Sequence, residues 1–178
     1  RLRQSACALE YADIPSDAHI ITEIRNTLDA NKMHTDVHIR LTLTRGVKYT
    51  SGLDPRINTA GSTLIVLAEF KPPVYSKTGI TLITAKHPKP FADVLDQQIH
   101  SCNQLTSILA KIEANRAGAD DAILLDTSGV VAETNATHLF LVKDGTVKTP
   151  TTAACPEGIT RDAIITICKI NDIPCIVG

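Results

Sequence analysis

Strict alternation of apolar and polar residues over Val37–Thr44 constrains this chain most. Val37, Ile39, Leu41 and Leu43 alternate with polar residues throughout the segment. Because successive side chains of a strand point to opposite faces, the pattern predicts a strand with one buried face. The segment before it has apolar residues at helical spacing from Ile20 to Leu28. That spacing predicts a helix running to Asn31, with Ser16 as its N-cap.

The rest of the chain continues to mix helical and strand patterns. The elements expected are a helix over residues 1–11, strands over 64–70 and 80–85, a helix over about 103–117 that ends at Gly118, strands over 122–125, 130–133 and 138–142, turns over 126–129 and 143–145, a helix over 158–170 and a strand over 174–177. This order is typical of an α+β fold. We expect an N-terminal α+β lobe over residues 1–87 and a second lobe over 88–178. The stretches 72–79 and 88–90 are the alternative boundaries.

Composition excludes several classes of protein. The 178 residues carry 18 basic and 19 acidic side chains, so no positive excess exists to neutralise a nucleic acid. Aromatic residues make up 3% with no Trp, which argues against a base-stacking surface. No apolar run is long enough to cross a membrane. The five cysteines are scattered without a CxxC motif, which predicts reduced thiols in a cytoplasmic protein. The chain lacks an initiator Met, and we expect a fragment of a longer protein.

Two segments in the second half carry residues that can do chemistry. Gly158–Arg161 opens a helix after Pro156, and free N–H groups there form either an anion site or an ordinary helix cap. Glu133 follows apolar residues in a predicted strand, so its carboxylate either is buried against a cation or points to solvent. Residues 134–137 either line a pocket or form a turn. No HExxH or other metal-binding motif occurs, so no metal site is expected.

Taken in order, these segments resemble one family. The matching residues are 103–105, 108–114, 118–122, 125–126, Gly129, 133–140, 149–150 and 158–161. Their spacing is similar to that of the class IV pyridoxal-phosphate aminotransferases, which include branched-chain aminotransferases, D-amino-acid transaminases and aminodeoxychorismate lyases. The resemblance implies fold type IV, with a smaller N-terminal α/β lobe and a larger β-barrel-like lobe with helices. It also implies pyridoxal 5'-phosphate as cofactor and a homodimer.

The resemblance further implies roles for individual residues. Arg1 would grip the cofactor phosphate together with Ile159 and Thr160 at the helix opening. Glu133 would pair with the pyridine nitrogen and keep it protonated, so that the ring withdraws electrons. Residues 134–137 would border the substrate and the phosphate, with Thr134 and Asn135 binding the cofactor.

One expected residue is absent from the sequence. Members of the family carry a lysine, on a strand before the helix that starts near Asn103, which forms the Schiff base and moves the substrate proton. That position falls on Gln98, or alternatively on His100. A glutamine amide cannot form an imine, and histidine forms no stable one. The nearest lysines are Lys86, Lys89 and Lys111, of which Lys86 is the candidate to reach the site.

The resemblance implies transfer of an amino group between a small amino acid and a 2-oxo acid. Arg45 and Lys48, in a predicted loop, are candidates to bind the substrate carboxylate, or are solvated loop charges. The alternatives are a lyase acting on aminodeoxychorismate, a non-catalytic protein that binds pyridoxal phosphate or a related anion, and a purely structural fragment. No nucleic-acid or membrane partner is expected.

Overall fold

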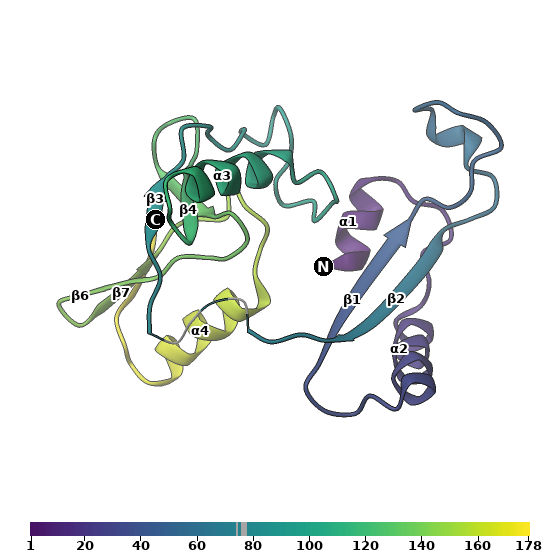
Figure 1. Ribbon diagram of the computed structural model, residues 1–178, viewed down its shortest axis with the longest axis horizontal. Helices are drawn as coiled ribbons and strands as arrows, with labels where there is room; N and C mark the ends of the chain where they lie inside the picture. The colour runs from purple at the N-terminus through teal and green to yellow at the C-terminus, as the bar shows by residue number, and fades with distance from the viewer. Residues whose placement is uncertain (74, 76–77) are drawn as a thin grey trace. The chain divides into compact units, whose positions relative to one another are not determined.

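The computed structural model describes residues 1–73, 75 and 78–178 (Figure 1). The chain divides into two compact units, Arg1–Val74 and Tyr75–Gly178, each described by itself below. The division falls earlier than the expected one after residue 87. The reason is that the strand at 82–84, which the sequence assigned to the first lobe, pairs with a strand of the second unit.

The first unit combines two helices with a two-stranded sheet. Helix α1 spans Leu2–Ala8, α2 spans Asp17–Asn31, β1 spans Val37–Thr44, the short helix η1 spans Pro55–Ile57 and β2 spans Thr63–Phe70. Helix α2 begins as predicted, because the Ser16 hydroxyl accepts a hydrogen bond from the His19 backbone amide at 3.2 Å. The first helix is shorter than expected and ends at Ala8. Strands β1 and β2 pair antiparallel, and α2 packs on β2.

The second unit contains a mixed sheet with the order β3-β4-β5. Its strands are β3 (Leu82–Thr84), β4 (Asp121–Leu125) and β5 (Val131–Thr134). Strands β3 and β4 are parallel, whereas β4 and β5 form the antiparallel hairpin that the turn after Asp126 predicted. Helix α3, spanning Leu105–Arg116, packs on β4. The core between them consists of Ala85, Ala110, Ala114, Ala122 and Leu124.

A second three-stranded sheet has the order β6-β7-β8. It consists of β6 (Leu141–Lys143), β7 (Thr146–Thr149) and β8 (Cys175–Val177), and α4 spans Ile159–Ile170. The expected strand over 138–142 starts later, and β7 was not predicted. Together the two units confirm the α+β class. The β-barrel-like lobe expected from the resemblance is represented here by two separate sheets.

The segment before α3 does not form the strand that the resemblance implied. Residues 91–104 form turns instead. The Val94 amide bonds the Phe91 carbonyl, and the Asp96 side chain accepts a hydrogen bond from the Gln98 amide at 2.9 Å. An aspartate that bonds an amide two residues later stabilises a turn rather than a strand. Gln98 and His100 therefore lie in a loop.

Candidate functional site

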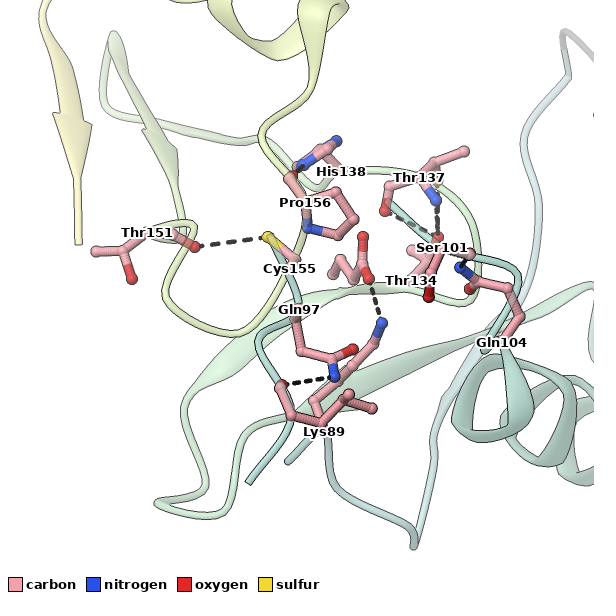
Figure 2. A network of polar contacts seen from close by, with 12 residues as sticks. Lys89, Gln97, Ser101, Gln104, Thr134, Thr137, His138, Thr151, Cys155 and Pro156 are labelled. Carbon is pink, nitrogen blue, oxygen red and sulfur yellow. Dashed lines mark hydrogen bonds and ion pairs between the residues drawn. The ribbon is translucent and has the colours of Figure 1, made fainter. Parts of the chain in front are cut away.

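A buried ion pair lies at the centre of the second unit. The Lys89 Nζ and Glu133 Oε1 atoms are 2.5 Å apart, and the two side chains are 4% and 7% exposed. Figure 2 shows the Lys89 amine pointing at this carboxylate. Removing both charges from water is costly, and only a close, well-aligned contact offsets that cost. The pair is therefore a buried, closely paired set of opposite charges.

The position of Glu133 follows from strand β5. Ala132, Glu133 and Thr134 are all buried, and Glu133 lies opposite Leu124 in the register of the sheet. The solvent-facing alternative for this carboxylate is therefore wrong. Its burial is possible because Lys89 neutralises it, and this partner is remote in sequence.

The backbone around Lys89 is held in place on the edge of the sheet. Its amide donates to the Leu125 carbonyl at 2.8 Å, and it forms a parallel bridge with Asp126. Pro88 and Pro90 flank it, and proline fixes the backbone angle φ. The sequence named Lys89 among nearby lysines but favoured Lys86. The two flanking prolines are a local sign of a fixed backbone at Lys89, but they do not state which carboxylate its amine meets.

The loop after β5 closes on itself. The Thr134 amide donates to the Thr137 carbonyl at 2.8 Å, and the Thr137 amide donates to the Thr134 hydroxyl at 3.0 Å. The turn interpretation of residues 134–137 is therefore confirmed, and their place in a ligand pocket remains a prediction. Asn135 Oδ1 is buried and has no hydrogen-bond partner within the described residues. A buried unpaired acceptor is rare in folded proteins and indicates a place for a ligand or water.

Helix α4 opens without a side-chain cap. Gly158 is its N-cap residue, no side chain caps it, and Ile159 and Thr160 are exposed. The first amides of a helix lack partners within the helix, so this opening is available to an anion. The anion-site interpretation of Gly158–Arg161 thus remains a prediction that the local structure permits.

His138 and Gly158 pack tightly against each other at the start of α4. The His138 Nε2 atom donates to the Pro156 carbonyl at 2.8 Å. A Cβ atom placed on Gly158 would lie 2.5 Å from His138 Cε1, which leaves room for glycine alone.

Arg161, 7% exposed, donates to the Pro150 carbonyl at 2.7 Å, and its Nε is buried without a partner among the described residues.

Three potential metal ligands gather beside the ion pair. The donor atoms of Glu133, His138 and Cys155 lie within 4.8 Å of one another. Burial, and then the charge of Glu133, raise the pKa of the Cys155 thiol to about 11, so it stays protonated near neutral pH. His138 is bonded to Pro156 and Glu133 to Lys89. We therefore assign these groups to the polar cluster around the Lys89–Glu133 ion pair and not to a metal centre.

The remaining predicted residues lie in two places. Gln98 Nε2 donates to the Thr152 carbonyl at 3.3 Å, so its amide lies beside the loop that leads into α4. In the first unit, Arg45 donates to the Glu10 carbonyl at 3.1 Å and lies over the Tyr11 ring, 4.5 Å from its centre. Lys48 donates to the Gly52 carbonyl at 2.7 Å. Arg1 belongs to the first unit and His100 to the second. Their roles, and those of Arg45 and Lys48, remain predictions.

Comparison with known proteins decides the family. The family model described as "Amino-transferase class IV" matches residues 1–178. This chain is a class IV aminotransferase family member. It is 50% identical over 166 residues to "Branched-chain-amino-acid aminotransferase-like protein 2" of Arabidopsis thaliana. The match covers 93% of this chain and 30% of that protein.

Solved structures of the class IV family share its fold. A T.th. branched-chain amino acid aminotransferase complexed with N-(5'-phosphopyridoxyl)-L-glutamate superposes with a TM-score of 0.86 at 30% identity, covering 98% of this chain and 56% of that one. The Escherichia coli branched-chain aminotransferase gives 0.89 at 26% identity, with coverages of 98% and 59%. The expected fold type IV is thereby confirmed. This class IV chain spans about a third of the length of its Arabidopsis relative and somewhat over half of these structures.

Proposed function

We propose that this chain forms part of a pyridoxal-phosphate-dependent aminotransferase. The reaction would move an amino group between a small amino acid and a 2-oxo acid. The observation that carries the proposal is the buried carboxylate of Glu133, the residue to which the family resemblance assigns pairing with the pyridine nitrogen. Membership of the class IV family and the names of the relatives support a branched-chain amino acid as the donor.

The residues of the second unit fit the cofactor at both of its ends. Glu133 offers a buried negative charge to a protonated ring nitrogen, and the uncapped opening of α4 at Ile159 and Thr160 offers amides to a phosphate. A binding surface formed by the loop after β5 and the opening of α4 is consistent with two further features. These are the unpaired acceptor Asn135 Oδ1 and the close packing of Gly158 against His138. When bound, the cofactor supplies an electron-withdrawing ring. The phosphate contact proposed for Arg1, a residue of the first unit, rests on the family resemblance alone.

In this proposal the residues named above bind and orient the cofactor and the substrate. A different group moves the substrate proton. Thr134 stiffens the loop after β5 through its bonds to Thr137, and this loop would border the cofactor. For Arg45 and Lys48, which belong to the first unit, binding of the substrate carboxylate is a proposal that rests on the sequence alone. General base catalysis contributes roughly 10²- to 10⁴-fold to a rate, so a chain without a suitable base at Gln98 turns over slowly.

A second candidate function is reversible binding of pyridoxal phosphate or a related anion without catalysis. Gln98 and His100, where the family has lysine, favour it. A lyase acting on aminodeoxychorismate is the third candidate, supported by one solved relative described as a 4-amino-4-deoxychorismate lyase, with a TM-score of 0.87 at 27% identity. Measuring pyruvate release against amination of a 2-oxo acid separates lyase from transaminase.

We further propose a homodimer in the cytoplasm. The homodimer follows from the family alone. For the cytoplasm, the five cysteines are all unpaired, which is typical of a reducing compartment. In the described ranges, none of the helices has the length and apolar character that crossing a membrane requires.

The test introduces a lysine at Gln98 and compares it with the matched control Gln97→Lys. Each protein is mixed with pyridoxal phosphate, reduced with borohydride and mapped by mass spectrometry, and amino transfer to a 2-oxo acid is measured. A linkage and amino transfer gained by Gln98→Lys alone support the aminotransferase. Reversible binding without transfer in either variant favours the binding protein. The absence of binding in every variant contradicts both.

A further inference from the structure

The role proposed for Glu133, pairing with the ring nitrogen, does not explain why its carboxylate forms an ion pair with Lys89. One oxygen of the carboxylate already contacts an ammonium at 2.5 Å, in a place nearly closed to solvent. Within the described part of the chain, Lys89 is the cation that forms an ion pair with Glu133. A protonated pyridine that approaches the same carboxylate meets a cation of equal charge.

We propose that Lys89 is an internal competitor for Glu133 and thereby sets the affinity of the site for a protonated ring nitrogen. The inference rests on the proposed function. Without a bound ring, the Lys89 ammonium keeps the buried carboxylate paired and so avoids the cost of an isolated charge. When a pyridinium binds, the Lys89 ammonium either shares the Glu133 carboxylate with the ring nitrogen or moves away from it. The net attraction for the ring nitrogen is then smaller than a free buried carboxylate provides.

The local backbone requires the side chain to make this adjustment. Lys89 is fixed by its hydrogen bond to Leu125, its bridge to Asp126 and the prolines on both sides. The four-carbon stem of lysine has several rotatable bonds, so the amine can move while the backbone stays in place. Competition of this kind needs no movement of the sheet.

The other polar groups near the carboxylate have partners of their own or carry no charge in this structure. The Cys155 thiol is neutral near neutral pH, because burial raises its pKa to about 11. Arg161 directs one guanidinium nitrogen to the Pro150 carbonyl and another to Asp162, 3.8 Å away. His138 donates to Pro156. Removing the Lys89 charge therefore leaves Glu133 in need of a cation, which a pyridinium supplies.

The experiment compares two probes on the 178-residue chain. Pyridoxal 5'-phosphate has a ring nitrogen that accepts a proton, and its 1-deaza analogue has a carbon in that place but the same phosphate. The ratio of their dissociation constants, deaza over pyridoxal phosphate, isolates the contribution of the ring nitrogen. Fluorescence titration measures both constants for the wild type, Lys89→Met, Lys89→Arg and the control Lys143→Met, at an exposed lysine of the same unit.

We expect the ratio to rise by about tenfold or more in Lys89→Met, since an opposite charge beside a titrating group shifts its pKa by roughly one to three units. It should stay near the wild-type value in Lys89→Arg and Lys143→Met. In Glu133→Gln the ratio should no longer depend on residue 89. If Lys89→Met does not unfold cooperatively, Lys89→Gln replaces it with the same expected rise.

Two results overturn the competition while leaving the proposed function intact. One is a ratio that stays the same or falls in a folded Lys89→Met or Lys89→Gln variant that still binds both probes. The other is borohydride trapping of the pyridoxyl group on Lys89, which would make this amine a covalent partner of the cofactor. Failure of the proposed function looks different, because neither probe then binds any variant, and both proposals fall together.

Discussion

Tyr75 donates a 2.6 Å hydrogen bond to Oδ2 of Asp121, a carboxylate with no exposed surface at the start of β4. The other oxygen of Asp121 accepts from the Ala122 amide at 2.7 Å. The bond ties the beginning of the second unit to its central strand. Burial, then the bond to Asp121 and its charge, raise the pKa of the Tyr75 hydroxyl to about 12 from 10.0.

This bond predicts a loss of stability at alkaline pH. Because the pKa of Tyr75 is higher in the folded than in the unfolded chain, its contribution is complete below pH 10 and is lost as pH rises toward 12. Tyr75→Phe should flatten this part of the stability profile and lower stability by about 1–3 kcal/mol at neutral pH. Urea unfolding at a series of pH values measures both effects. An unchanged alkaline slope in Tyr75→Phe would show that another group is responsible.

Glu113 predicts the opposite dependence at acid pH. The Lys86 amide, first, and the His87 ring, second, hold the pKa of the Glu113 carboxyl below its ordinary value of 4.5. Its contribution to stability is therefore present above pH 4.5 and is lost as pH falls through the lower folded pKa. Glu113→Gln should weaken the acid dependence of thermal unfolding. Glu157→Gln serves as the control, and an equal effect of both changes would contradict the prediction.

Gly158→Ala tests the tight approach at the opening of α4. The added methyl group would lie 2.5 Å from His138 Cε1, so the ring must shift away from its bond to Pro156. Overpacking of this kind costs about 1–3 kcal/mol. Chemical denaturation measures the loss, and combination with His138→Ala should recover part of it. A double variant that loses as much as the sum of the two single changes would rule out the contact as the cause.

Leu124→Ala tests the core between α3 and the β3-β4-β5 sheet. Leu124 is fully buried in one cluster with Ala85, Ala110 and Ala122. Replacing it removes packed methyl groups and leaves a cavity, which costs about 2–5 kcal/mol. Leu53→Ala, at a residue that is 99% exposed, is the matched control and should change stability little. Both are read from the midpoint of urea unfolding, and similar midpoints would contradict the assignment of the core.

Local patterns in the sequence predicted many of the elements well. The strand over Val37–Thr44 has the predicted bounds, and Ser16 caps α2 as expected. The turn after Asp126 also forms, because the Asp126 side chain bonds the Ser128 and Val130 amides. Each of these features depends on residues within a few positions of one another. Hydrophobic period, caps and turn residues therefore suffice to specify them.

The candidate site was harder to predict because its contacts are remote in sequence. The order of the family motifs singled out Glu133 and the opening of α4, and it predicts that the family's lysine position falls on Gln98 or, alternatively, on His100. The turns around Asp96 and the burial of Glu133 required the folded chain. So did Lys89, since nothing near it in the sequence states which carboxylate its amine meets.

The sequence by itself determined the periodic elements, the family motifs and the absence of lysine at Gln98 and His100. Only the tertiary structure decided that Glu133 is buried and that Lys89 neutralises it. The physical reason is the range of the forces involved. Helix and strand patterns arise between neighbours along the chain, whereas the free energy of a buried charge depends on the group that folding brings beside it.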